Sequence, residues 1–496
     1  MKVIKTPRHA RIIAAVLSML LLAGTCHAAE SGPVHVVLSW TQDPATTVTA
    51  AWRCDTPSEQ VMQVVQGAQY DQSGFADAVV FSAACKDISL DGTGIWHYEA
   101  MADGLEPGTT YAYRVGNEHA WSEVKTFTTV DPASKTLTFA YMGDVQPAND
   151  SEAEFALWGE LAQAMVERNP ELSFAILGGD IVNSGISLEQ FDLFASNAEN
   201  VFSAIPLLAT PGNHESNFIG GKPELYLDYF AFPQNGPEGF EEEIYSFDVA
   251  NCHILSLNSW IFSGEQPLSE ADYERVNNWI EYDLITSDAD WQIVVTHIPV
   301  YAVHSDTTST KVKENWAPIF ERCGVDLVFV GHQHVYSRSY PMYEGKVDYE
   351  NGIPYIMGVS GSKFYGSADE TFAERTVYNT ASYQLVQIDG DALTVQTLDA
   401  EGNELDWCNV QQREVSMTRG EYMEILWHCA GSPDAGVSPF TDSQSTAVTW
   451  AYEAGLVLGY GNGCFGPEDP MKDWHIEIMI ERLARSGGIV RGKDRA

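Results

Sequence analysis

Five short apolar runs, each followed at once by glycine or a polar residue, place the strongest limit on the fold of this 496-residue chain. Each run has the length of a buried strand, and the residues after it are typical of a strand end. Between the runs, segments 154–167 and 270–284 have the apolar spacing of amphipathic helices. Alternating strands and helices predict an α/β domain, which we place at residues 135–400. The runs are Leu137–Met142, Ser173–Leu177, Ile205–Ala209, Trp291–Thr296 and Val325–Val330.

The segments that follow these runs contain the candidate functional residues. Open α/β folds bind their ligands on such loops, at one edge of the sheet. Carboxylate oxygens and imidazole nitrogens suit divalent or trivalent transition metals, and a carboxylate can bridge two of them. A pair of ions clamps the attacking and leaving oxygens of a phosphoryl displacement. The sequence therefore predicts a two-metal site, with Asp180 as the bridge. The segments are Gly143-Asp144-Val145-Gln146, Gly179-Asp180-Ile181-Val182-Asn183, Gly212-Asn213-His214-Glu215, Val294-Val295-Thr296-His297 and Gly331-His332-Gln333-His334.

This ordered set of motifs resembles the calcineurin-like metallophosphoesterases, and most closely their purple acid phosphatase branch. The segments 291–301 and 358–361 are also similar to segments of that branch. The resemblance implies two packed mixed sheets flanked by helices. It implies that His214 faces the substrate and assists the leaving group. It further implies one metal held by Asp144, Asp180 and His334, and a second held by Asp180, Asn213, His297 and His332.

Two positions depart from the family pattern. Purple acid phosphatases carry a tyrosine three residues after the second aspartate, and its phenolate binds iron and gives the colour; here that position is Asn183. Other branches carry histidine two residues after the first aspartate, where this chain has Gln146. The first metal then lacks its usual fourth protein ligand, unless the carbonyl oxygen of Gln146 takes that role. A neutral oxygen donor weakens a preference for ferric iron and leaves zinc, manganese and ferrous iron open, so we expect no purple colour.

Two further residues are candidates for substrate binding. His304 falls on a loop after His297, and Lys363 follows the turn at Gly361. Either could contact the phosphate of the substrate; the alternative is that both are solvated loop residues.

The first 28 residues have the pattern of a signal peptide, with basic residues ahead of the apolar stretch Ile12–Leu22 and small residues at Ala28 and Ala29. No other apolar run is long enough to span a bilayer, so we expect a secreted protein without a transmembrane segment after cleavage. The formal net charge of −42 argues against nucleic-acid binding. It also favours small phosphoesters over large polyanions as substrates.

Residues 32–130 contain short alternating strands separated by turns, which predict a small β-sandwich. The run Leu105–Gly116 resembles a fibronectin type III-like domain, which purple acid phosphatases often carry ahead of the catalytic domain. Cys54 and Cys85 fall in neighbouring strand-like segments of this region, where they either form a disulfide or remain two buried thiols.

Residues 415–485 have a helical pattern and resemble about one and a half S-layer homology repeats. The turn Thr418-Arg419-Gly420-Glu421 and the segment Gly463-Cys464-Phe465-Gly466-Pro467 carry this resemblance. It implies binding to cell-wall polysaccharide; the alternative is a small helical cap packed on the enzyme.

Together these patterns predict a multidomain protein with an N-terminal β-sandwich, a two-sheet α/β metallophosphoesterase domain and a small helical C-terminal module. We expect a secreted or cell-wall-associated phosphomonoesterase that uses a metal-bound hydroxide. One alternative is a phosphodiesterase acting on nucleotides or cell-surface polymers. Another, of a different class, is a surface binding or scaffold protein whose metal site has decayed.

Overall fold

The computed structural model describes residues 32–68, 71–89, 94–216, 221–263, 268–366 and 371–485. The predicted signal peptide, residues 1–28, lies outside the described residues. Among the helices within these ranges, none is both long and apolar enough to cross a membrane.

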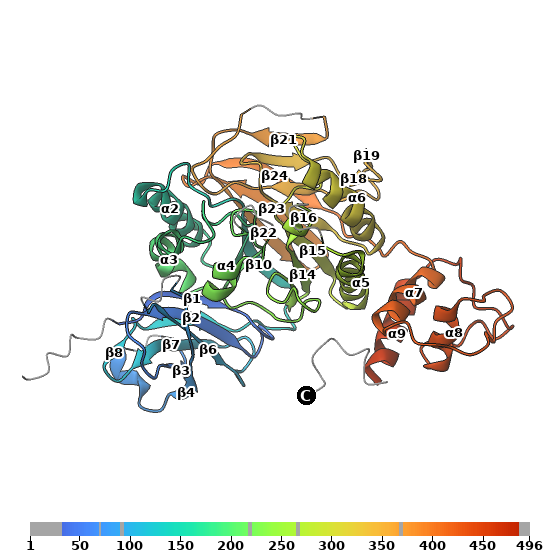
Figure 1. Cartoon of the computed structure of the whole chain (residues 1–496), viewed down its shortest axis with the longest axis horizontal. Coiled ribbons are helices and arrows are strands. Elements are labelled where there is room, and N and C mark those ends of the chain that lie inside the picture. The colour runs from blue at the N-terminus through green and yellow to red at the C-terminus, as the bar shows by residue number, and fades with distance from the viewer. Residues whose placement is uncertain are drawn as a thin grey trace, which may run out of the picture.

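The N-terminal region consists of two antiparallel sheets that enclose a common core, as predicted (Figure 1). Trp52 stacks on Tyr98 inside this core, with ring centroids 5.7 Å apart. The first sheet has the order β1-β2-β6-β5, with β1 Val34–Ser39, β2 Val48–Cys54, β6 Trp96–Ala102 and β5 Ala84–Asp87. The second has the order β4-β3-β7-β8, with β4 Val79–Ser82, β3 Val61–Gln66, β7 Thr110–Asn117 and β8 Ala120–Trp121, while β9 (Lys125–Thr128) also pairs with β7.

No disulfide joins Cys54 and Cys85 in the described part of this domain, and only Cys54 is buried, whereas the Cys85 thiol is exposed. The prediction of two buried thiols is therefore wrong for Cys85. Cys54 lies on β2 and Cys85 on β5, and both strands pair with β6, which separates them. The sequence pattern could not reveal this order, because the two segments look like direct neighbours along the chain.

The α/β region contains two mixed sheets, as expected. In the six-stranded sheet, β10, β11 and β12 are parallel and β22 is antiparallel to β10. Its order is β12 Leu207–Ala209, β11 Phe174–Leu177, β10 Thr136–Met142, β22 Tyr383–Asp389, β23 Ala392–Leu398 and β24 Glu404–Val410. The seven-stranded sheet has the order β13 Ile244–Val249, β14 Cys252–Leu257, β15 Trp291–Thr296, β16 Leu327–Val330, β20 Tyr355–Met357, β17 Tyr336–Ser339 and β21 Ala373–Val377. A small hairpin, β18 Met342–Tyr343 and β19 Lys346–Val347, lies outside both sheets.

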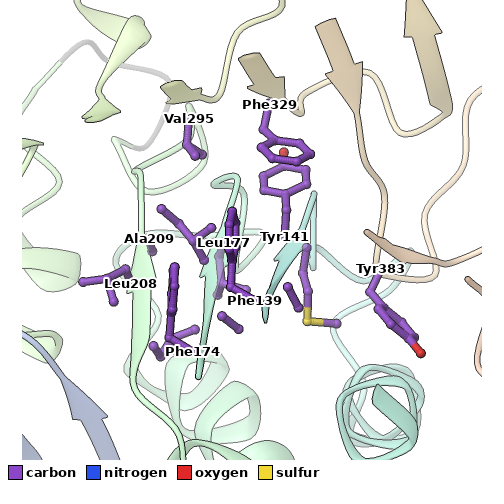
Figure 2. Close-up of a cluster of buried hydrophobic side chains, with 14 of the residues drawn as sticks. Phe139, Tyr141, Phe174, Leu177, Leu208, Ala209, Val295, Phe329 and Tyr383 are labelled. Atoms are coloured by element: carbon purple, nitrogen blue, oxygen red, sulfur yellow. The ribbon is translucent and has the colours of Figure 1, made fainter. Parts of the chain in front are cut away.

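The two sheets pack face to face through buried aromatic side chains. Tyr141 on β10 stacks on Phe329 on β16 with ring centroids 4.3 Å apart, as Figure 2 shows. The Tyr141 hydroxyl also donates a hydrogen bond to the carbonyl oxygen of Val330 at 2.7 Å. These contacts fix the ends of β10 and β16 next to each other, which matters because the candidate site residues follow both strands.

Helices cover the outer faces of the two sheets. Side chains of α2 (Glu152–Arg168) and α3 (Leu188–Phe202) join the core of the six-stranded sheet. Side chains of α5 (Glu270–Thr286) and α6 (Thr307–Arg322) join the core of the seven-stranded sheet. The short helix α4 (Glu224–Tyr229) and the 3₁₀ turns η1 (Gln72–Phe75) and η2 (Ser259–Phe262) complete the described elements before the C-terminal module.

The C-terminal module consists of α7 (Arg419–Cys429), α8 (Thr446–Glu453) and α9 (Asp473–Arg485), seen beyond α5 in Figure 1. Thr418 and Glu421 form a capping box that starts α7. The Tyr422 hydroxyl donates to the carbonyl oxygen of Ile285 at 2.9 Å, at the end of α5. Buried residues of α7 belong to the same hydrophobic cluster as the seven-stranded sheet. The module is therefore packed on the α/β region.

Candidate active site

The candidate site residues follow the C-terminal ends of five strands and converge on one place. Ligand atoms of Asp180, His297 and His332 lie within 4.8 Å of one another, and so do those of Asp144, Asp180 and His334. Asp180 belongs to both groups. The strands and their residues are β10 with Asp144, β11 with Asp180, β12 with Asn213 and His214, β15 with His297, and β16 with His332 and His334.

Asp180 has an unusual backbone that aims its carboxylate into the site. Its φ is +50°, a left-handed conformation that is uncommon for residues other than glycine. Gly212 packs against it so closely that a Cβ there would meet the Asp180 amide nitrogen at 2.3 Å. The Asp180 Oδ1 accepts a hydrogen bond from the His214 amide at 3.0 Å, and Oδ2 lies 3.3 Å from His297 Nε2. Such strain is typical of functional loops that their surroundings hold in place.

Glu215 holds this loop, a role that the sequence analysis missed. Its buried carboxylate accepts hydrogen bonds from the amides of Asp180 at 2.9 Å, Ile181 at 2.8 Å, Val182 at 3.3 Å and Gly212 at 2.7 Å. Burial raises the pKa of Glu215 to about 7, although these amides favour the charged form. The signal available in the sequence was an acidic residue directly after the Asn213-His214 pair.

Asn213 lies between two of the histidines. Its Oδ1 is 3.0 Å from His297 Nε2 and 2.8 Å from His332 Nδ1. His297 Nδ1 donates to the carbonyl oxygen of Gly178 at 2.8 Å, which directs Nε2 toward the centre. His332 Nε2 lies 4.0 Å from an Asp306 carboxylate oxygen. The donor atoms of the three residues therefore point to a common position.

Asp144 and His334 each have a buried polar atom without a hydrogen-bond partner among the described residues. These atoms are Asp144 Oδ2 and His334 Nδ1. The other carboxylate oxygen of Asp144 accepts from the His332 amide at 2.8 Å. Unpaired buried polar atoms cost free energy, and a cation bound by both residues would remove that cost. The residues present therefore fit a metal ion.

The electrostatics of His332 and His334 agree with this fit. Burial lowers the pKa of His332 to about 4 and that of His334 to about 3, so both rings are neutral and offer a lone pair near pH 7. Burial raises the pKa of Asp144 to about 7. Burial opposes ionisation of Asp180 as well, but the neighbouring His297 and His214 outweigh it and hold the pKa of Asp180 well below its usual range. The Asp180 carboxylate in turn raises the pKa of His297 to about 9 against the effect of burial.

Gln146 and Asn183, the two departures from the family pattern, contact each other. Gln146 Nε2 donates to Asn183 Oδ1 and lies 2.9 Å from His214 Nε2. Gln146 Oε1 accepts a hydrogen bond from Lys363 Nζ at 2.8 Å. Lys363 is thus the partner of Gln146 Oε1, and the role of this oxygen as a metal ligand stays a prediction.

His214 and His304 lie beside the donor clusters. His214 Nδ1 donates to the carbonyl oxygen of Asn183 at 2.7 Å, and its Nε2 is 4.0 Å from Asp180 Oδ2. Burial lowers the pKa of His214. The backbone amide of His304 donates a hydrogen bond to Gln333 Oε1 at 2.9 Å. The loop that carries His304 therefore contacts the segment that contains His332 and His334.

Three segments of the chain match known protein families. Residues 137–336 match the calcineurin-like phosphoesterases, residues 33–129 the purple acid phosphatase N-terminal domain, and residues 439–472 the S-layer homology domain. Two carboxylate and imidazole clusters that share one aspartate, on loops between two packed mixed sheets, agree with the phosphoesterase match. The chain therefore contains a calcineurin-like phosphoesterase domain, preceded by a purple acid phosphatase N-terminal domain and followed by an S-layer homology domain. The resemblance stated from the motifs is thus confirmed.

Individual relatives support this family. The chain is 26% identical to purple acid phosphatase 18 of Arabidopsis thaliana over 275 residues, which cover 52% of this chain and 56% of that protein. It is 29% identical to probable purple acid phosphatase 20 of the same plant over 322 residues, which cover 60% of this chain and 71% of that protein. The chain therefore spans little more than half the length of some of the curated relatives that it matches.

Solved structures show the same fold. Purple acid phosphatase PPD1 from yellow lupin (Lupinus luteus) seeds has a TM-score of 0.61 and 16% identity, with 77% of this chain and 75% of that chain covered. A structure of PhoD has a TM-score of 0.56 and 14% identity, with 77% of this chain and 91% of that chain covered. At such identities the likeness concerns the fold alone.

Proposed function

We propose that the protein hydrolyses phosphomonoesters at a dinuclear metal centre. The observation that carries the proposal is the position of Asp180, whose carboxylate belongs to both groups of donor atoms. We assign Asp144, Asp180 and His334 to one ion, and Asp180, Asn213, His297 and His332 to the other. When bound, such ions polarise the phosphoryl oxygens and lower the pKa of a bound water.

The side chains around this centre would bind and orient the ester. The Lys363 ammonium and His304 are the residues we assign to the phosphate oxygens, because both lie next to the donor clusters. His214 would assist the departing oxygen through Nε2, since its Nδ1 is held by the carbonyl oxygen of Asn183. To act as a proton donor there, His214 must first take up a second proton; burial disfavours this and lowers the pKa of His214, while the nearby Asp180 carboxylate favours it.

Asn183 argues against the chromophore of the purple enzymes. Its side-chain amide hydrogen-bonds Gln146 and Asp150 and offers no phenolate to iron. We therefore expect zinc, manganese or ferrous iron in the centre and no tyrosinate-to-iron absorption band. A strong visible band that fades on reduction would contradict this assignment.

The S-layer homology domain suggests association with the cell surface or wall. We propose that the enzyme is secreted and acts there on small phosphoesters, with cell-wall polysaccharide as the partner of the C-terminal module.

The direct test of the proposed activity is a substrate comparison with metal-loaded protein. Phenyl phosphate and diphenyl phosphate share a leaving group and differ in the number of ester bonds. Faster release of phenol from the monoester is the expected result. In His297→Ala this hydrolysis should disappear together with the bound metal. Faster release from the diester would favour the phosphodiesterase alternative, and the absence of both metal binding and hydrolysis would favour the scaffold with a decayed metal site.

A further inference from the structure

The segment from Ser360 to Tyr365 is held at both ends by residues of one donor cluster. The amides of Ser360 and Gly361 donate to the carbonyl oxygen of Asp144 at 2.9 and 2.7 Å. At the other end, the Tyr365 amide donates to the carbonyl oxygen of His334 at 3.1 Å. Ser362 Oγ also accepts from the Ala148 amide at 3.0 Å. The segment therefore runs beside the Asp144-Asp180-His334 cluster in a fixed conformation.

The Tyr365 ring lies against two histidines of the site. Its centroid is 4.8 Å from that of His334 at an interplanar angle of 51°, and 6.0 Å from that of His304 at 72°. The Lys363 ammonium is 5.7 Å from the same ring, while it also reaches Gln146. The aromatic ring and the cation thus border the same corner of the site.

Tyr365 is not part of the protein core. It belongs to none of the hydrophobic clusters of the described residues, and 37% of its surface is exposed. Packing alone gives no reason for a large ring held by its backbone beside candidate metal ligands. A partly exposed aromatic ring next to a polar centre is suited to stack on planar apolar groups.

We propose that Tyr365 is a specificity-determining residue that stacks on the leaving group, so that the site prefers phosphomonoesters of aromatic alcohols. This inference rests on the proposed phosphomonoesterase function. Lys363, on the phosphate side of the ring, would hold the anionic end of the same substrate.

The test compares benzyl phosphate with cyclohexylmethyl phosphate. Both are esters of primary alcohols of similar size, and only one carries an aromatic ring. The wild-type protein should have the higher kcat/KM for benzyl phosphate. Tyr365→Ala should lower that value by about 3- to 10-fold, the range expected for a lost aromatic contact, and should leave the cyclohexylmethyl ester nearly unchanged.

Two controls separate stacking from damage to the centre. Tyr365→Phe should keep the preference, because the ring remains. Tyr349→Ala removes another exposed tyrosine, on the loop after β19, and should change neither ester. Inhibition by inorganic phosphate should be the same in Tyr365→Ala as in wild type, since the stacked ring would touch only the leaving group.

An unchanged preference in Tyr365→Ala would overturn the inference. So would a preference that instead responds to Phe372→Ala, because Phe372 lines a separate cavity of about 630 Å³ along α6. If neither ester is hydrolysed, the proposed function fails, and binding of benzylphosphonate against cyclohexylmethylphosphonate decides the stacking without turnover. Equal affinity of wild type and Tyr365→Ala for benzylphosphonate would then refute it.

Discussion

The Glu215 carboxylate accepts the backbone amide of Asp180 at 2.9 Å and thereby positions the one aspartate that both donor clusters share. The same oxygen accepts the amide of Gly212 at 2.7 Å. Glu215 thus joins the loop after β11 to the loop after β12. Glu215 belongs to neither donor cluster, yet it positions the aspartate that they share.

We predict that Glu215→Gln weakens metal binding and hydrolysis. The amide has the shape of the carboxylate, but its NH₂ group would face backbone N–H groups that then lose their acceptor, at a cost of about 1–3 kcal/mol. Metal affinity is measured by competition with a chelator, and stability by thermal unfolding. Glu243→Gln is the matched control, because Glu243 is also buried but accepts from Asn258 at 2.8 Å in another part of the fold. It should lower stability without changing metal affinity. Equal metal affinity in Glu215→Gln and wild type would contradict the positioning role.

His253 should make stability depend on pH between about 6.5 and 9. Burial lowers the pKa of His253, but Asp248 at 2.7 Å and Asp283 at 2.9 Å outweigh burial and raise it to about 9. A group whose pKa is raised in the folded state stabilises the fold fully at a pH below its unfolded-state pKa. This stabilisation is lost as the pH rises through the folded-state pKa. The shift corresponds to roughly 3 kcal/mol. Melting temperatures across this range should fall for wild type, and Asp283→Asn should flatten the profile. Parallel profiles for the two proteins would show that the ion pair contributes nothing.

His214 should give hydrolysis of poor leaving groups an acidic optimum. Burial lowers the pKa of His214, so the protonated ring becomes populated only below its ordinary range of about 6.5. An alkyl phosphate needs a proton on its leaving oxygen more than 4-nitrophenyl phosphate does. The ratio of the two kcat values should therefore rise as the pH falls, provided that metal content is constant. His214→Ala should lower the alkyl rate by about 10²–10⁴-fold and abolish this pH dependence. A ratio that does not vary with pH in wild type would exclude His214 as the acid.

Removal of residues 415–485 should reduce thermal stability. Tyr422, Met423 and Leu426 of α7 are buried in the hydrophobic cluster that also contains the seven-stranded sheet. Truncation would expose the α5 side chains that belong to this cluster. If the module also anchors the protein, wall sedimentation should require it. Unchanged stability on truncation would show that the packing on α5 contributes little, and equal sedimentation with and without the module would rule out anchoring.

The sequence predicted the strands of the site because each one is a short apolar run with a clear end. β15, for example, occupies the predicted Trp291–Thr296. The sequence did not predict the role of Glu215, because a carboxylate that accepts hydrogen bonds from backbone amides has no characteristic spacing in the chain. Nor did it predict Tyr365, which reaches His334 only through the order of β16, β20 and β17 in the sheet. The separation of Cys54 from Cys85 likewise depends on strand order, which local patterns do not contain.

Metal analysis of purified Asp180→Asn is the sharpest test of a metal centre in which Asp180 is shared by both ions. The substitution removes the shared charge with almost no change in shape. Asp389→Asn, at an exposed position of β22, removes the same charge far from the donor clusters and serves as the control. We predict that wild type and Asp389→Asn contain a pair of metal ions per chain and hydrolyse phenyl phosphate, whereas Asp180→Asn loses metal and activity together while remaining folded. Full metal content with full activity in Asp180→Asn would contradict this prediction.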